Sequence, residues 1–101
     1  MKFSVYMLIS INRNRAYTYV GYTSNLKKRI LLHNNSKGAK YTRGRVWKII
    51  YKKNYKTKSL AMKNEFKLKK DYKKRNKIKI KYLQKLLWRF LYFYPIKKVF
   101  H

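Results

Sequence analysis

A strand-like segment that runs through a glycine into a capped helix is the feature that most constrains the fold of this chain. Residues 16–22, AYTYVGY, are rich in residues that favour strands and contain Gly21. The following LKKRILLHN is typical of a short helix. Its candidate N-caps are Thr23, Ser24 and Asn25, and its predicted apolar stripe is Leu26, Ile30 and Leu31. Gly21 then marks either a bulge or a close approach of the backbone.

The remaining chain predicts two more strands and two more helices in one domain. Residues 2–11 alternate in the manner of a strand, and the polar turn NRNR joins them to residues 16–22 in an antiparallel hairpin. The sequence VWKIIYKKN predicts a third strand, after a loop over residues 35–45. The predicted helices cover residues 56–74, capped by Thr57 or Ser59, and residues 77–94, ended by Pro95.

The charge of the chain predicts a polyanionic partner. There are 29 Lys and Arg residues against two acids, which gives a net charge of +27. A field this positive favours binding to nucleic acid, with a solvated basic surface as the plainer alternative. The chain has no cysteine, which excludes a disulfide framework and a cysteine zinc site. No apolar run approaches the roughly 20 residues that span a bilayer, so we expect a cytoplasmic protein without a membrane span.

The two acids limit where a divalent metal can bind, because Mg²⁺ prefers carboxylate oxygens. Glu65 follows the helical spacing of Ala61, Leu68 and Tyr72, which predicts that it faces the body of the domain. An inward carboxylate needs a cation or a metal beside it, so the alternative is an ion pair with a lysine. Asp71 lies within KKDYKK and is predicted to be a surface partner for lysines.

Two pairs of polar side chains are candidates for chemistry. Arg29 and His33 lie one helical turn apart and project from the same side of the helix, although an ordinary solvated face has the same pattern. Tyr6 and Tyr19 lie on the two strands of the predicted hairpin, where cross-strand packing can bring both phenols to one face. A simple stack of aromatic rings is the alternative for the tyrosines.

An ordered set of short motifs resembles the GIY-YIG nuclease superfamily, most closely its small stand-alone bacterial members. The motifs are SVY at residues 4–6, YVG at 19–21, the helix with Arg29 and His33, KGAKYTRGR at 37–45 and LAMKNEFKLK at 60–69. The resemblance covers about residues 3–75. The chain departs from the motifs in a conservative way, with Ser4 for Gly and with Val5 and Val20 for Ile.

The resemblance implies an α+β fold, a three-stranded antiparallel sheet flanked by helices, with a catalytic face. On that face it implies Tyr6 and Tyr19 as the motif tyrosines, Arg29 as the arginine that contacts phosphate, and Glu65 as the ligand of Mg²⁺ or Mn²⁺. Gly21 closes the second motif. His33 stands where many members carry a histidine, with a role in orienting a tyrosine or moving a proton. The expected activity is metal-dependent, structure-dependent endonuclease cleavage of DNA in repair or processing.

Basic and aromatic residues around these motifs are the expected contacts to nucleic acid. They are Lys27, Lys37, Lys40, Tyr41, Thr42, Arg43 and Arg45. A non-catalytic module that binds DNA or RNA on the same fold is the alternative function. We expect a nuclease domain over residues 1–85, a packed aromatic and basic extension over 86–101, and a monomer or weak dimer. The aromatic extension would also suit a membrane surface.

Overall fold

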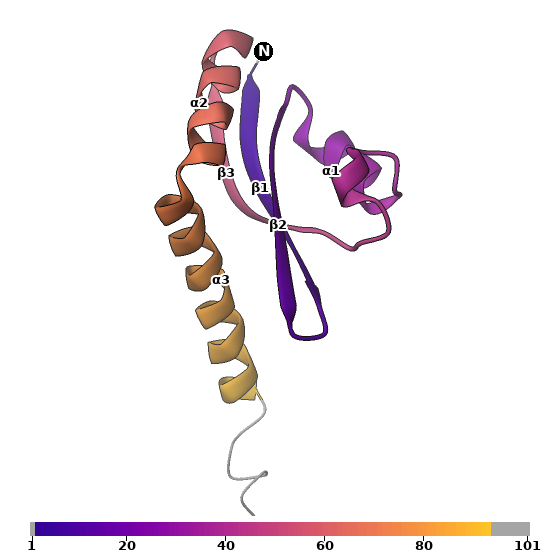
Figure 1. Cartoon of the computed structure of the whole chain (residues 1–101), viewed down its shortest axis with the longest axis vertical. Helices are drawn as coiled ribbons and strands as arrows, with labels where there is room; N and C mark the ends of the chain where they lie inside the picture. Colours follow the sequence, from indigo (N-terminus) through magenta and orange to yellow (C-terminus); the bar gives the residue numbers. More distant parts are fainter. Residues whose placement is uncertain (1, 94–101) are drawn as a thin grey trace, which may run out of the picture.

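A three-stranded antiparallel sheet organises the chain, as Figure 1 shows for the computed structural model, which describes residues 2–93. Its strands are β1 (Phe3–Asn12), β2 (Arg15–Thr23) and β3 (Lys48–Tyr55), in the order β2-β1-β3. Strand β1 is therefore central, and its residues 5–10 are all buried. The predicted hairpin and the third strand are confirmed, and so is the α+β fold class.

Helix α1 (Leu26–Asn34) covers one face of the sheet. Asn25 is its N-cap, since the side-chain oxygen accepts a hydrogen bond from the Lys28 amide at 3.1 Å. Leu26 and Ile30 pack against the buried residues Tyr6, Leu8 and Trp47. Leu31 is 59% exposed, so its predicted place in the apolar stripe is wrong. His33, which is fully buried, faces the sheet one turn after Ile30.

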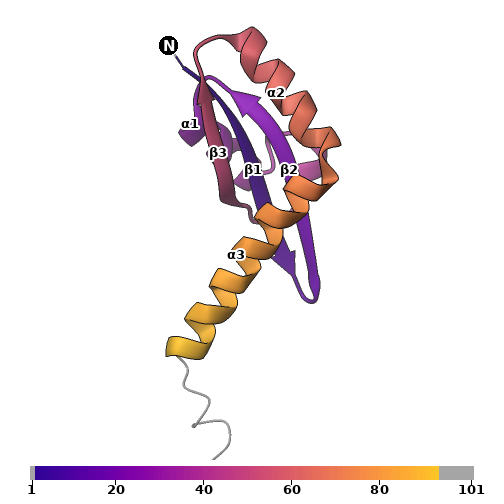
Figure 2. The same ribbon diagram turned by 90° about the vertical axis from the view of Figure 1, so that its left-hand side faces the viewer.

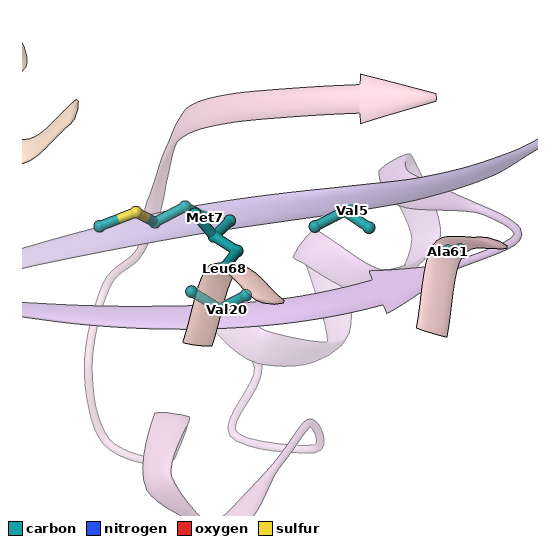
Figure 3. Packing of buried hydrophobic residues seen from close by; sticks show 5 residues of the cluster. All are labelled: Val5, Met7, Val20, Ala61 and Leu68. Carbon is teal, nitrogen blue, oxygen red and sulfur yellow. The ribbon is translucent and has the colours of Figure 1, made fainter. Parts of the chain in front are cut away.

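Helix α2 (Lys58–Lys70) lies on the opposite face, where Figure 2 shows it in front of the sheet and α1 behind. Thr57 caps it by accepting a hydrogen bond from the Leu60 amide. Ala61 and Leu68 pack against apolar side chains of β1 and β2, as Figure 3 shows. These partners are Val5, Met7 and Val20. Successive residues of β1 thus contact α1 and α2 in turn, as the two-residue period of a strand requires.

The second predicted helix is interrupted at Asp71, so a single helix over residues 56–74 is wrong. Helix α2 ends at Lys70, and α3 (Tyr72–Phe93) begins directly after Asp71. The Asp71 carboxylate accepts a hydrogen bond from the Lys74 amide at 3.1 Å, which caps α3. Among the described residues the one ion pair joins Glu65 and Lys69, so Asp71 serves as a helix cap and not as a partner for lysines. Tyr72 is 66% exposed and does not extend the buried stripe.

Helix α3 projects past the end of the sheet in Figures 1 and 2. It runs without interruption through the predicted boundary at residues 85/86, and the side chains of Leu87 and Trp88 are exposed. Pro95 and the rest of the predicted extension lie outside the described residues, and the division of the chain stays a prediction. Within residues 2–93, no helix combines the length and apolar character that crossing a bilayer requires.

Replacing Asp71 separates capping from ion pairing. We expect Asp71→Ala to lower the free energy of unfolding by about 1 kcal/mol, because the first turn of α3 loses its side-chain acceptor. Asp71→Asn keeps an equivalent acceptor without the charge, and should stay close to the wild type in urea unfolding. Equal destabilisation by both variants would instead assign the effect to the negative charge.

Candidate active site

The pairing of β1 with β2 brings the two motif tyrosines to one face of the sheet. Tyr6 lies directly opposite Gly21, and Tyr19 lies two residues before that glycine. The Tyr6 and Tyr19 ring centroids are 6.3 Å apart. A Cβ atom at Gly21 would lie 2.5 Å from the Tyr6 hydroxyl oxygen, so the phenol occupies the space that a side chain there would need. Gly21 therefore provides the room for Tyr6.

His33 connects this tyrosine to the loop that follows α1. Its Nε2 lies 2.8 Å from the Tyr6 hydroxyl oxygen, and its Nδ1 lies 2.8 Å from the Thr42 hydroxyl oxygen. All three side chains are fully buried. A Cβ atom at Gly38 would clash with the His33 ring, so this second glycine gives the imidazole its room.

The direction of these hydrogen bonds follows from Thr42. Its hydroxyl donates its single hydrogen to the Ala39 carbonyl at 2.8 Å, and so it can only accept from His33 Nδ1–H. Burial, and secondarily the charge of Arg29, lowers the pKa of His33, which favours the neutral ring. Neutral His33 with its hydrogen on Nδ1 then has a free lone pair on Nε2, and the Tyr6 hydroxyl donates to it.

Arg29 places a positive charge beside both phenols from α1. A hydrogen bond with the Tyr6 phenol, opposed by burial, raises the pKa of the Arg29 guanidinium. Burial raises the pKa of Tyr6 to about 12, and this increase is reduced by the hydrogen bond to Arg29. The cluster therefore combines a neutral phenol, a neutral imidazole and a guanidinium.

Glu65 faces the sheet from α2, as its helical spacing predicts. Its side chain is 18% exposed, and one carboxylate oxygen lies 3.3 Å from Lys69 Nζ, so the predicted alternative of a lysine ion pair is present too. The Glu65 charge contributes to the raised pKa of Tyr6, which places the carboxylate within electrostatic range of the tyrosine cluster.

The donor set fits a lightly ligated hard cation. Among the described residues there is no group of three His, Cys, Asp or Glu side chains that could hold a metal. His33 already uses both ring nitrogens, which leaves Glu65 as the ligand near the cluster. Mg²⁺ is often bound by one or two carboxylates and keeps several waters, so a single carboxylate suits Mg²⁺ better than Zn²⁺.

The predicted nucleic-acid contacts divide into three groups. Tyr41 stacks on Tyr19 with ring centroids 6.3 Å apart, next to the cluster. Arg45 lies 3.6 Å over the ring of Tyr17, and its hydrogen bond lowers the pKa of that tyrosine. Apart from the buried Thr42, the remaining four are exposed: Lys27 on α1, Lys37 and Arg43 on the following loop, and Lys40 in the 3-10 turn of that loop.

Thr42 is a correction to the sequence analysis, because its fully buried side chain cannot contact a phosphate. It lies in the short 3-10 helix η1 (Lys40–Thr42) and holds His33. Trp47 fixes this loop from the other side, because its indole N–H donates to the Thr42 carbonyl at 2.8 Å. The motif KGAKYTRGR marked the segment but not which of its side chains point inward.

Two cations that sequence reasoning missed lie at the edge of β2. Lys69 and Arg75 line a cavity of about 240 Å³ together with Tyr19 and Tyr41. The Arg75 Nε is buried and has no hydrogen-bond partner among the described residues. Their position could not be read from the sequence, since it depends on the break between α2 and α3.

The fold and this cluster define an α+β domain with a tyrosine-centred polar site, and the comparisons identify its family. Residues 2–79 match the GIY-YIG catalytic domain, so this chain belongs to the GIY-YIG family. Membership implies nuclease-type hydrolysis of phosphodiester bonds in nucleic acid, and nucleases of this family generally use a divalent metal.

Small bacterial proteins are similar to this chain. A UPF0213 protein of Streptococcus pneumoniae is 42% identical over 70 residues, which are 68% of this chain and 70% of that protein. One from Staphylococcus epidermidis is 40% identical over 68 residues, 66% of this chain and 82% of that protein. One from Oceanobacillus iheyensis is 48% identical over 52 residues, 50% of this chain and 60% of that protein. No solved structure matches the chain.

The buried histidine should dominate the pH dependence of stability between pH 7.5 and 5. Its pKa is lowered in the folded state, so the unfolded chain binds more protons below about pH 6.5. The contribution of His33 to the free energy of unfolding is therefore fully present above that pH. As the pH decreases, the free energy of unfolding falls by up to about 1.4 kcal/mol per pH unit. Urea unfolding across this range measures the slope.

One substitution identifies the group responsible. His33→Gln should flatten the slope, whatever its effect on stability at pH 7.5. A slope that survives His33→Gln would contradict a buried neutral imidazole.

Proposed function

We propose that this chain is a metal-dependent endonuclease that hydrolyses phosphodiester bonds of DNA, in a structure-dependent manner linked to repair or processing. The observation that carries the proposal is the buried hydrogen bond from the Tyr6 phenol to an unprotonated nitrogen of His33. It sits beside Arg29 in a chain of the GIY-YIG family. A cytoplasmic location and a monomeric or weakly dimeric state stay predictions.

Tyr6 is the proposed general base, acting together with His33. Alone, a phenol with a pKa of about 12 holds its proton too tightly to be a base at neutral pH. In the proposed step, the phenol proton of Tyr6 passes to His33 Nε2 while the attacking water gives a proton to the phenol oxygen. Tyr6 therefore ends neutral, and His33 becomes the imidazolium. Arg29 stabilises the negative charge that develops on the phenol oxygen during this transfer.

Access to Tyr6 depends on its aromatic neighbour. Tyr6 is fully buried, and its hydroxyl fills the space in which a Cβ atom at Gly21 would lie. The Tyr19 ring edge is 3.1 Å from that same point. Tyr19, half-buried and stacked on Tyr41, therefore covers the catalytic oxygen. The attacking water therefore reaches Tyr6 only when the Tyr19 ring moves aside, and we assign to Tyr19 the control of this access.

The basic side chains near the cluster are the proposed contacts to phosphate groups. Arg29 offers a planar fork of N–H groups to the non-bridging oxygens of the cleaved phosphate. Arg75, with its buried and unsatisfied Nε, and Lys69 provide donors in the cavity beside Tyr19. The exposed basic side chains of the loop, Lys37, Lys40 and Arg43, would bind neighbouring phosphates, which positions the strand without reading its sequence.

Glu65 is the proposed metal ligand. When bound, Mg²⁺ or Mn²⁺ supplies Lewis-acid stabilisation of the phosphate and of the leaving oxygen. The Lys69 partner keeps the partly buried carboxylate paired in the absence of the metal. The ion pair uses one carboxylate oxygen of Glu65, so the carboxylate would hold the divalent ion beside Lys69, and Lys69 would stay available as a donor to the substrate phosphate.

The first test is a cleavage assay on labelled single-stranded, duplex and branched DNA, and on RNA, with and without Mg²⁺ or Mn²⁺. We expect metal-dependent cleavage that falls by more than about 100-fold in Glu65→Ala, because the metal ligand is lost. Binding at matched salt should change little, since the net charge of +27 supplies most of the affinity.

The outcomes separate the two functions. Wild-type cleavage rates in Glu65→Ala would disprove the metal assignment. Tight binding without cleavage of any substrate would assign the chain to the alternative, a non-catalytic module that binds DNA or RNA on the same fold.

A second test addresses the proton path through Thr42, which acts as a positioning residue. Thr42→Val keeps the shape of the side chain but removes the acceptor for His33 Nδ1–H. The ring hydrogen can then move to Nε2, where it prevents transfer of the Tyr6 proton to that nitrogen. We expect a rate loss approaching that of Tyr6→Phe, which should be about 100-fold or more. Thr42→Ser should restore the rate.

Ring ¹⁵N chemical shifts of His33 distinguish this role from a loss of packing. They should report hydrogen on Nδ1 in the wild type and in Thr42→Ser, and a changed tautomer in Thr42→Val. A slow Thr42→Val variant with the wild-type tautomer would make Thr42 a purely structural residue.

A further inference from the structure

A second concave surface lies away from the tyrosine cluster. A groove of about 1010 Å³ is formed by α1, β3 and α3. Because the strand order is β2-β1-β3, this groove borders the edge of the sheet opposite to the β2 edge, where Tyr19, Tyr41 and Arg75 line the smaller cavity. None of the catalytic roles proposed above uses it.

The lining combines an apolar floor with cations and contains no acid. The floor includes Ile49 and Ile78 and two half-buried tyrosines, Tyr51 and Tyr82. Five basic side chains line the same groove, all of them exposed: Lys27, Lys52, Lys81, Lys85 and Arg89. A concave site with this charge favours an anionic ligand that also has flat apolar parts.

Helix α3 contributes both parts of the lining from one face. Ile78 and Tyr82 are four residues apart, and Lys81, Lys85 and Arg89 follow the same spacing alongside them. Consecutive cations of this row are therefore about 6 Å apart along the helix axis. The row lies beyond residues 2–79, which match the GIY-YIG catalytic domain, and it gives the basic C-terminal segment a regular surface for binding.

We propose that this groove binds a single-stranded nucleic-acid segment that flanks the cleaved bond. The bases would lie on Tyr51, Tyr82 and the isoleucines, and the phosphates on the row of cations. The proposal rests on the proposed function for the identity of the substrate, and it adds to it a preference for substrates with a single-stranded flank.

The apolar floor argues for a single strand and against a duplex. A duplex stacks its bases internally and offers mainly phosphates to a basic surface, so isoleucine and tyrosine side chains would gain little from it. A single strand exposes the faces of its bases, and these stack on aromatic side chains while the backbone follows a basic groove. Both components are present in this groove.

Helix α1 connects the groove to the proposed active site. Lys27 lines the groove, while Arg29, two residues later on a different side of the same short helix, acts electrostatically on Tyr6. The same short helix therefore carries side chains of both surfaces.

The test compares affinities for a labelled oligothymidylate and for a blunt duplex of equal length by fluorescence anisotropy. All proteins carry Glu65→Ala, so that cleavage does not interfere. The groove variant is Lys81→Glu with Lys85→Glu. Its matched control is Lys63→Glu with Lys67→Glu, an exposed pair at the same spacing on α2 with the same change in net charge.

We expect the groove variant to bind the single strand about ten-fold more weakly than the control variant does. The two variants should bind the duplex with equal affinity. Tyr82→Ala should weaken single-strand binding by about five-fold or more, through lost stacking, without changing its salt dependence. Circular dichroism tests whether each variant is folded. If α3 unfolds in the charge-reversing variant, the neutral pair Lys81→Gln with Lys85→Gln takes its place.

Equal losses in the groove and control variants would overturn the proposal, and so would equal losses for both DNA forms. A groove-specific loss of binding to phosphatidylserine vesicles, with DNA binding like the control, would assign the groove to a membrane surface instead. The result is independent of catalysis: cleavage lost with Glu65→Ala tests the nuclease, whereas the contrast between the two lysine pairs tests the groove.

Discussion

The buried hydrogen bonds of His33 are the interaction on which the rest of the site depends. Its ring joins α1, the central strand through Tyr6, and the loop through Thr42. A buried polar group left without its partner costs about 1–3 kcal/mol, so the three segments must agree in position. Gly21 and Gly38 make this possible, because any side chain at either position would occupy the space of Tyr6 or His33. The polar cluster thereby acts as part of the core and as the candidate chemistry.

The scarcity of acids gives each carboxylate a defined place in a chain with a charge of +27. Asp71 is used at the junction of two helices, where its side chain caps α3, one of the elements that line the basic groove. Glu65 is partly buried next to Lys69, within range of the tyrosine cluster. The positive field can attract nucleic acid to the whole surface. A divalent cation, in contrast, can bind only where a carboxylate interrupts this field.

The sequence predicted well wherever local chemistry decides the structure. The strand pattern, one cap from each set of candidates (Asn25 and Thr57) and the inward face of Ala61, Glu65 and Leu68 are all present. The predictions were wrong where one residue type is found in two different structural environments. A threonine in a basic loop is usually solvated, and an aspartate among lysines usually pairs with them, yet Thr42 is buried against His33 and Asp71 caps a helix. The prediction for Leu31 is also wrong, since the inward face of α1 consists of Leu26, Ile30 and His33, and Leu31 is exposed.

The family, the hairpin with its third strand and the set of side chains available for chemistry follow from the amino-acid sequence, because periodicity, capping and motif order are local properties of the chain. Tertiary structure alone decided how these side chains are connected. The direction of the Tyr6–His33–Thr42 hydrogen bonds, the position of Arg75 beside Tyr19 and the groove between α1, β3 and α3 each join segments far apart in sequence. Such contacts are set by the packing of the two sheet faces and by the break at Asp71, which no local pattern specifies.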